Sequence, residues 1–225
     1  QQAAHSDEQV KERLGFITSA LDAGQPRART WLYGWLAAYS AGAVAGGILA
    51  GTHWGDQKLE GTEMVPDREL AEGMLVTGAT FVLGVAGLVM DPFVPATAAR
   101  KLRPLPESTS SERLAKLKRA EELLRECARR EKSGRSLTTH MLNLGANAAG
   151  GIVTKAAFHQ SWGSALITFA SGEAVSLLNI FTQPMRATRD LKKYEAGYPA
   201  AATAAARASW SLSVWPGGFG FRLQF

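Results

Sequence analysis

The sequence predicts a mostly α-helical protein: an internally duplicated helical bundle, with two apolar helical hairpins each preceded by an amphipathic helix, and a C-terminal β-hairpin. Three observations lead to this fold class. The stretch from Trp31 to Trp54 contains no Asp, Glu, Lys or Arg, part of it recurs later in the chain, and the last residues alternate between apolar and polar side chains.

The duplication is visible in two matched segments. Ala45-Gly46-Gly47-Ile48 recurs as Ala149-Gly150-Gly151-Ile152, and in the apolar segment that follows each copy Leu75-Val76-Thr77 is matched by Leu166-Ile167-Thr168. Such a recurrence predicts one supersecondary unit that occurs twice. We therefore expect a first three-helix repeat over residues 1–106, a second over 107–198, and an Ala-rich spacer with the β-hairpin over 199–225.

Composition narrows the class of protein. With 225 residues, of which 46% are hydrophobic and 20% charged, the chain is well outside disordered composition. The net charge is +5, but the basic residues cluster between the apolar segments, as they do at solvated helix ends. Because no basic stripe interleaved with aromatic residues is present, we expect no nucleic-acid partner.

The first expected element is a short amphipathic helix over residues 6–22. Ser6 suits its N-cap, and the apolar residues from Val10 to Leu21 recur at helical spacing on one face. Gly24 and Pro26 are expected to end this helix before the long apolar stretch begins.

The stretch from Thr30 to Gly55 is a second expected helix. Its 26 uncharged residues make a helix about 39 Å long, which is enough to cross a bilayer core of about 30 Å. Glycines spaced four residues apart predict that another backbone comes close to this helix. The expected helix-packing glycines are Gly42, Gly46, Gly47 and Gly51, with Gly150 and Gly151 in the second copy.

Four expected segments complete the first repeat and begin the second. A polar connector over residues 55–68 leads to a helix over 67–90, whose main part has no charge and no polar face, as in a helix that is buried on all sides or lies in a membrane. A linker follows as far as Pro106. Residues 108–133 are highly charged yet periodic, which predicts an exposed amphipathic helix equivalent to residues 6–22.

The second hairpin, expected over residues 137–155 and 163–183, has a polar side on each helix. Glu173 projects on the apolar arc, and a turn near Gln160 would place it level with Asn147. A carboxylate there is costly unless it is protonated or paired. It is either an edge group paired with Asn, Arg or Lys, or part of a ligand, proton or ion site. The candidate polar site consists of Glu173, Asn147 and His140.

Catalytic patterns are absent from the sequence. It has no glycine-rich phosphate loop, no HExxH, no nucleophile elbow and no Cys/His metal spacing. The single cysteine, Cys127, excludes an intramolecular disulfide and falls on an apolar stripe, so we expect it to be buried. His53 and His159 occupy corresponding turns, where polar residues are common. We therefore expect no enzymatic activity, no cofactor and no metal site.

The C-terminal segment differs in kind from the rest. Residues 210–215 and 219–225 alternate around Pro216-Gly217-Gly218, which predicts a β-hairpin. An alternating strand that ends in an aromatic residue resembles the C-terminal signal of Gram-negative outer-membrane proteins. The resemblance implies outer-membrane association, for which several copies would have to contribute strands, because one hairpin cannot close a barrel. The alternative is a hairpin that pairs with a partner's sheet or packs on the helical body. The expected membrane or partner contacts are Trp210, Trp215, Phe219, Phe221 and Phe225.

These features favour a non-enzymatic envelope protein that acts as a membrane-associated structural or assembly subunit. We expect it in an oligomer or larger complex, with membrane lipid or other protein subunits as its partners. The alternative is a protein that binds or conducts lipids or small solutes through the interior of its hairpins. A start at Gln1 rather than Met fits either a trimmed sequence or a removed leader. A removed leader, with the C-terminal pattern, predicts the outer membrane or periplasm of a Gram-negative bacterium.

The sequence leaves open whether the apolar hairpins span a bilayer or form a soluble core. A soluble bundle would bury the first hairpin at its centre. A membrane protein would need the second hairpin to line a polar interior.

Overall fold

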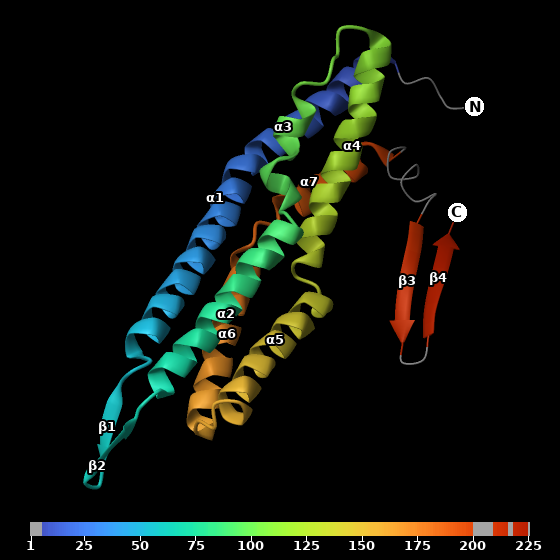
Figure 1. The fold of residues 1–225 in the computed structure, drawn as a ribbon. Helices are drawn as coiled ribbons and strands as arrows, with labels where there is room; N and C mark the ends of the chain where they lie inside the picture. The colour runs from blue at the N-terminus through green and yellow to red at the C-terminus, as the bar shows by residue number, and fades with distance from the viewer. Residues whose placement is uncertain (1–5, 200–208, 216–217, 225) are drawn as a thin grey trace.

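The structure is a computed structural model that describes residues 6–199, 209–215 and 218–224, and it is mostly helical (Figure 1). In chain order the elements are α1 (Asp7–His53), β1 (Gln57–Glu60), β2 (Glu63–Pro66), α2 (Glu69–Met90), η1 (Val94–Ala96), α3 (Ala98–Leu102), α4 (Ser110–Ser133), α5 (Leu137–Ala156), α6 (Trp162–Thr182), α7 (Arg186–Gly197), β3 (Ser209–Trp215) and β4 (Gly218–Gln224).

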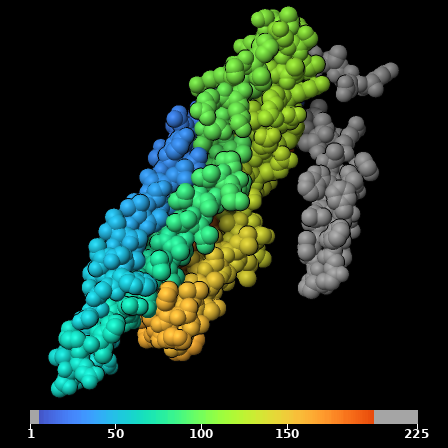
Figure 2. All heavy atoms as spheres, viewed as in Figure 1, coloured from blue at the N-terminus to red at the C-terminus, as the bar shows by residue number. Residues whose placement is uncertain are grey.

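The helices form an elongated body with two dissimilar ends (Figures 1 and 2). At one end the first part of α1 packs with α3, α4 and α7, and we call this part the charged half. At the other end the rest of α1, from Trp31, lies with α2, α5 and α6, and we call this part the apolar bundle. The β1–β2 hairpin extends beyond the apolar bundle, at the end farthest from α4.

The predicted break at Gly24 and Pro26 is wrong, because α1 continues through both as one helix of 47 residues. A proline inside a helix removes one backbone hydrogen bond and costs about 3 kcal/mol. Tertiary packing offsets this cost: Leu21 and Ala28 are buried on either side of Pro26, and the Gln25 side chain donates to the Ala96 carbonyl. The expected N-cap is present, since Ser6 and Gln9 form a capping box.

Two connectors carry structure that the sequence interpretation missed. The segment expected to be a polar connector, residues 55–68, contains the antiparallel β1–β2 pair, which turns at Gly61 with a φ of +65°, a conformation that glycine adopts without strain. The expected linker before Pro106 contains η1 and α3. Both additions are short, so neither carries a long periodic pattern that a sequence could reveal.

The core of the charged half joins four helices. Apolar residues of α1 between Val10 and Leu21 pack against a run of buried α4 residues from Leu117 to Cys127. Leu102 of α3 and Tyr194 of α7 complete this cluster. The apolar face predicted for residues 6–22 therefore packs on the apolar face predicted for the charged helix α4.

Close glycine contacts hold each hairpin together. A Cβ atom at Gly46 would lie 2.8 Å from the Cα atom of Gly78 in α2, and one at Gly42 would meet the Phe81 ring. In the second hairpin a Cβ at Gly151 would lie 2.9 Å from the Ala165 carbonyl oxygen. Gly150 faces Val76 of α2 instead, and therefore lies between the two hairpins.

Gly47 and Gly51 do not have the close neighbour that we expected. A Cβ atom at either position would meet nothing within 4 Å among the described residues. They lie on the outer side of α1, where Val44 and Ile48 are also exposed. The Gly42 and Gly46 side of the helix faces α2, so the two glycine pairs face different surroundings.

The β3–β4 pair is antiparallel, with Trp210 opposite Leu223 and Trp215 opposite Gly218. The expected duplication stays a prediction, although the order of elements fits it. In the second repeat the charged helix α4 is followed by the α5–α6 hairpin and the short helix α7. In the first repeat the amphipathic segment and the first hairpin helix are joined in α1, and α2 and the short helix α3 follow.

Candidate binding pocket within the apolar bundle

The apolar bundle presents large apolar side chains to the outside. Ile48 of α1, Leu83 of α2, Leu142 of α5 and Leu166 of α6 are each at least 60% exposed. Its interior contains polar side chains, with Asn147, Thr154 and Gln160 all buried. This distribution is the reverse of that in a water-soluble bundle, in which apolar side chains are inside and amide side chains outside.

Three helical segments of the described chain are long and apolar enough to cross a membrane: Asp7–His53, Glu69–Met90 and Trp162–Gly197. At most 17% of the most apolar window of each is buried within the structure. The helix α5 is less apolar because of its inward polar residues. Its 20 residues nevertheless reach about 30 Å, which matches the thickness of a bilayer core.

A pocket of about 400 Å³ opens among α2, α5 and α6, with Tyr39 of α1 and Arg130 of α4 at its edge. Its lining combines polar and apolar side chains, and each of the three helices contributes both kinds. The polar residues include Thr77, Thr80, Asn143, Asn147, Thr168, Ser171, Ser176 and Asn179, and the apolar residues include Phe81, Leu83, Leu88, Leu142 and Val175.

Two hydrogen bonds hold the Asn147 side chain in this pocket. Its side-chain NH₂ group donates to the Glu173 carboxylate over 2.9 Å and to the Ser176 hydroxyl over 3.1 Å. A Cβ atom at Gly172 would lie 2.5 Å from the Asn147 side-chain oxygen. The absence of a side chain at Gly172 therefore makes room for the Asn147 amide between α5 and α6.

Asn179 lines the same pocket nearer to the charged half. Its side-chain nitrogen is buried and has no hydrogen-bond partner among the described residues. Its backbone carbonyl accepts a bond from the Trp31 indole, and Thr182 on the next turn accepts bonds from both the Trp31 and the Trp35 indoles. These contacts attach α6 to α1 and hold Asn179 in place beside the pocket.

Two arginines bind backbone carbonyls at the C-terminal ends of α2 and α6, at the boundary with the charged half. Arg130 donates to the Asp91 carbonyl just after α2 and lies 3.1 Å from the Asp91 carboxylate. Arg135 donates to the Phe181 and Gln183 carbonyls at the end of α6. Cations at helix C-termini satisfy free carbonyls and interact favourably with the helix dipole.

At the opposite end Gln160 links the two hairpins. It follows α5 in the turn before α6, and its side-chain nitrogen donates to the Glu69 carbonyl and to the Glu72 carboxylate of α2, each over 3.0 Å. The Lys155 side chain donates to the Gln160 carbonyl. The pocket thus lies between two sets of polar contacts, those of Arg130 and Arg135 at one end of the apolar bundle and those of Gln160 at the other.

The structure separates the predicted polar site. It brings Asn147 and Glu173 together, but the His140 ring lies beside Phe181, and no contact between His140 and the other two is found in the described chain. Glu173 accepts a hydrogen bond from Asn147 and is not among the residues that line the pocket.

Thr77, Thr80 and Asn179 were not among the predicted site residues, although Asn179 falls on the polar side predicted for the helix over residues 163–183. Two threonines three residues apart in an otherwise apolar helix were the available signal.

The remaining predicted positions lie away from this pocket or outside the described side chains. The side chains of Trp210, Trp215, Phe219 and Phe221 are outside what the structure describes, and Phe225 lies outside the described residues. Cys127 is fully buried, and burial raises the pKa of its thiol to about 12. No group of three or more His, Cys, Asp or Glu residues in the described chain is arranged to hold a metal ion.

Compared with known protein families, with curated proteins and with solved structures, the chain shows no significant similarity, so any assignment of function depends on its own geometry.

Proposed function

We propose that this chain is a membrane-embedded structural or assembly subunit without enzymatic activity. The observation that carries the proposal is the reversed polarity of the apolar bundle, with leucine, isoleucine and phenylalanine side chains outside and Asn147, Thr154 and Gln160 inside. In water the exposed apolar surface would favour aggregation, whereas in a bilayer it faces hydrocarbon.

The positions of the charged residues support embedding. Within the four helices of the apolar bundle, Glu173 is the one charged residue away from the helix ends, and it is bonded to Asn147. Such a residue inside a membrane helix is expected to face the bundle interior and to have a partner.

Association with further subunits is the second part of the proposal. The outer side of α1 carries Gly47 and Gly51, which have no neighbour among the described residues. Small residues on a membrane helix permit another helix to approach closely.

We propose a Gram-negative cell envelope as the location. The alternating C-terminal sequence favours the outer membrane or periplasm within that envelope, whereas the apolar helices favour a membrane that holds helical proteins.

Fractionation of cells tests the embedding. Membranes are washed with carbonate and then with high salt, and the inner and outer membranes are separated by density. We expect the protein to remain in one membrane fraction after both washes. Release into the soluble fraction would contradict the proposal.

Extraction into lipid particles with a polymer then tests assembly. We expect a particle mass that corresponds to more than one copy or to a complex. Gly47→Val is expected to reduce that mass while the protein stays membrane-bound, and Ala170→Val on the outer side of α6 is the control. A single copy in the wild-type particle would contradict the assembly role.

A further inference from the structure

The pocket beside Asn147 and Asn179 has features that a purely structural subunit does not need. A buried amide nitrogen without a hydrogen-bond partner costs free energy, and such groups are rare in native proteins. The unpartnered nitrogen of Asn179 lies on the wall of a pocket of about 400 Å³, where a bound molecule can satisfy it.

The pocket wall carries no unbalanced charge. Arg130 is the one charged residue of the lining, and it is already paired with the carboxylate and the carbonyl of Asp91. Glu173, the nearest carboxylate on α6, bonds to Asn147 and is not part of the wall. An ionic ligand would therefore lose its hydration without gaining a free counter-charge, so the wall favours a neutral molecule.

The hydrogen-bonding groups that line the pocket favour a ligand with a hydroxyl group. The Thr77 hydroxyl donates to the Gly73 carbonyl and the Thr80 hydroxyl donates to the Val76 carbonyl, so each has used its one proton and offers only lone pairs to a ligand. Asn179 offers an N–H group. A ligand that matches both must donate and accept, which a hydroxyl does and an ester carbonyl does not.

The apolar part of the lining favours hydrocarbon. Phe81, Leu88 and Val175 line the same pocket, and the outer surface of the surrounding helices is apolar as well. A ligand with both hydroxyl groups and an alkyl chain would match the polar and the apolar lining residues together. A sugar or another fully polar solute would leave the apolar lining residues without a matching group.

We propose that this pocket binds a neutral amphiphile that carries hydroxyl groups on a hydrocarbon chain, of the monoacylglycerol class. The binding site goes beyond the structural role proposed above. Embedding and assembly can each hold while the pocket stays without a ligand, and the two sets of measurements are separate.

Native mass spectrometry of the full chain tests the site. The protein is purified in an amine-oxide detergent, because sugar-based detergents carry competing hydroxyl groups. Three probes with the same chain are titrated: 1-monooleoylglycerol, methyl oleate and oleate. We expect saturable binding of one monooleoylglycerol and about tenfold weaker binding of the other two, as for the loss of one or two hydrogen bonds. Equal binding of all three probes would overturn the proposal.

Two variants locate the binding in the pocket. Asn179→Leu and Thr80→Val are each expected to weaken monooleoylglycerol binding about five- to tenfold. Thr80→Val keeps the side-chain size and decides the question if Asn179→Leu does not fold. Ala170→Leu adds an apolar side chain on the exposed side of α6, outside the pocket, and is expected to bind as the wild type does. Wild-type affinity in both pocket variants would show that the probe binds elsewhere and would overturn the assignment.

Discussion

Arg13, Glu121 and Tyr194 join three helices of the charged half through buried polar groups. The Arg13 guanidinium forms an ion pair with the Glu121 carboxylate and donates from Nε to the Tyr194 hydroxyl over 2.8 Å, while that hydroxyl donates to Glu121. Arg13 is only 5% exposed. Burial and the Glu121 carboxylate both raise the pKa of the Tyr194 hydroxyl, so this group stays a neutral donor.

Removing Glu121 leaves a buried arginine without its carboxylate. We expect Glu121→Ala to destabilise the charged half by about 3 kcal/mol, because breaking a buried ion pair leaves an uncompensated charge. The control is Glu122→Ala on the same helix, where an exposed pair with Arg119 contributes about 0–1 kcal/mol. Thermal unfolding followed by circular dichroism measures both. An equal loss in the two variants would contradict the role of the buried pair.

Cys127 provides a second test at this scale. Because burial raises the pKa of its thiol to about 12, we expect no reaction with a maleimide at pH 8 in the folded protein and full reaction in denaturant. The unfolded thiol has a pKa of about 8.5, so it loses its proton first as the pH rises. The folded state is therefore expected to lose stability above that pH. Rapid labelling of the native protein would show that Cys127 is accessible.

Some contacts between residues could be predicted from the sequence and others could not. The Asn147–Glu173 contact follows from the hairpin, since a turn near Gln160 sets those positions level on adjacent antiparallel helices. The pocket beside them depends on α2 from the other hairpin, which no local pattern places there. The ion pair of Arg13 with Glu121 could not be predicted from the sequence either, because Glu121 lies on a helix more than a hundred residues away in the chain.

At the scale of elements, long periodic segments were predictable and short ones were not. The structure has α2, α4, α5 and α6 close to the predicted bounds. The helix α7 was missed because its start depends on another helix. The backbone N–H groups of Ala187 and Thr188 donate to the Glu131 carboxylate of α4, which acts as an N-cap from outside the segment. Despite these bonds, burial raises the pKa of Glu131.

The two neighbouring glycines of α1 give a matched test of the first hairpin. A Cβ atom at Gly46 would lie within 3 Å of the α2 backbone, whereas one at Gly47 would meet nothing within 4 Å. We expect Gly46→Val to lower the stability of the protein in detergent by at least about 2 kcal/mol, as for overpacking against a backbone that cannot move aside. Gly47→Val is expected to be nearly neutral in a monomer. The melting temperatures of both variants measure this, and similar values would contradict the α1–α2 contact.

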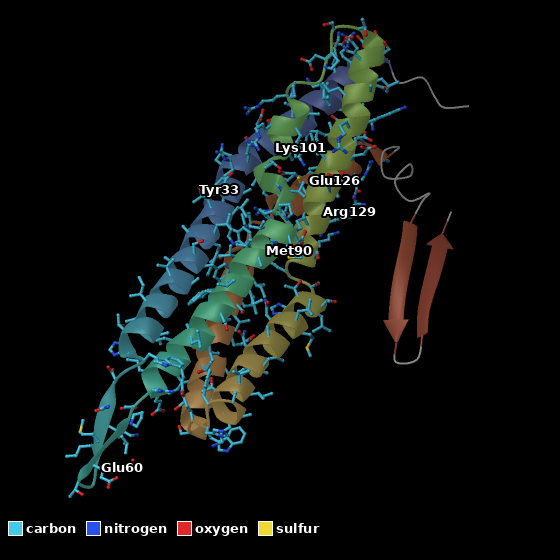
Figure 3. All side chains as sticks on the ribbon, in the orientation of Figure 1. Tyr33, Glu60, Met90, Lys101, Glu126 and Arg129 are labelled. Carbon is cyan, nitrogen blue, oxygen red and sulfur yellow. The ribbon has the colours of Figure 1, made fainter. Side chains whose placement is uncertain are left out.

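At the scale of the whole molecule, the two ends differ in charge. Of the chain's 25 Lys and Arg residues, only Lys58, Arg68 and Lys155 lie at the β1–β2 end of the apolar bundle. Apart from Arg207 and Arg222 near the C-terminus, all others lie at the charged half. Figure 3 places Lys101, Glu126 and Arg129 in that half and Glu60 at the tip of the opposite end.

This asymmetry predicts how the protein lies in a membrane. Basic residues in short connections stay on the cytoplasmic side of the membrane in which a helical protein is inserted. For insertion in the inner membrane, the location that the apolar helices favour, we therefore expect the charged half to face the cytoplasm and the β1–β2 hairpin to face the opposite side. The test uses single cysteines, Glu60→Cys and Ser108→Cys, with Cys127 unreactive in the background. In intact spheroplasts an impermeant maleimide is expected to label only the cysteine at position 60. Labelling of position 108 alone would reverse the orientation.

The long helix α1 has a mechanical consequence. At about 1.5 Å per residue, its 47 residues form a rod about 70 Å long that belongs to both halves of the molecule. The same helix contacts α2 at Gly46 and packs on α4 and α7 near Arg13. For a protein embedded as proposed, a tilt of α1 in the bilayer would therefore also displace its contacts with α4 and α7.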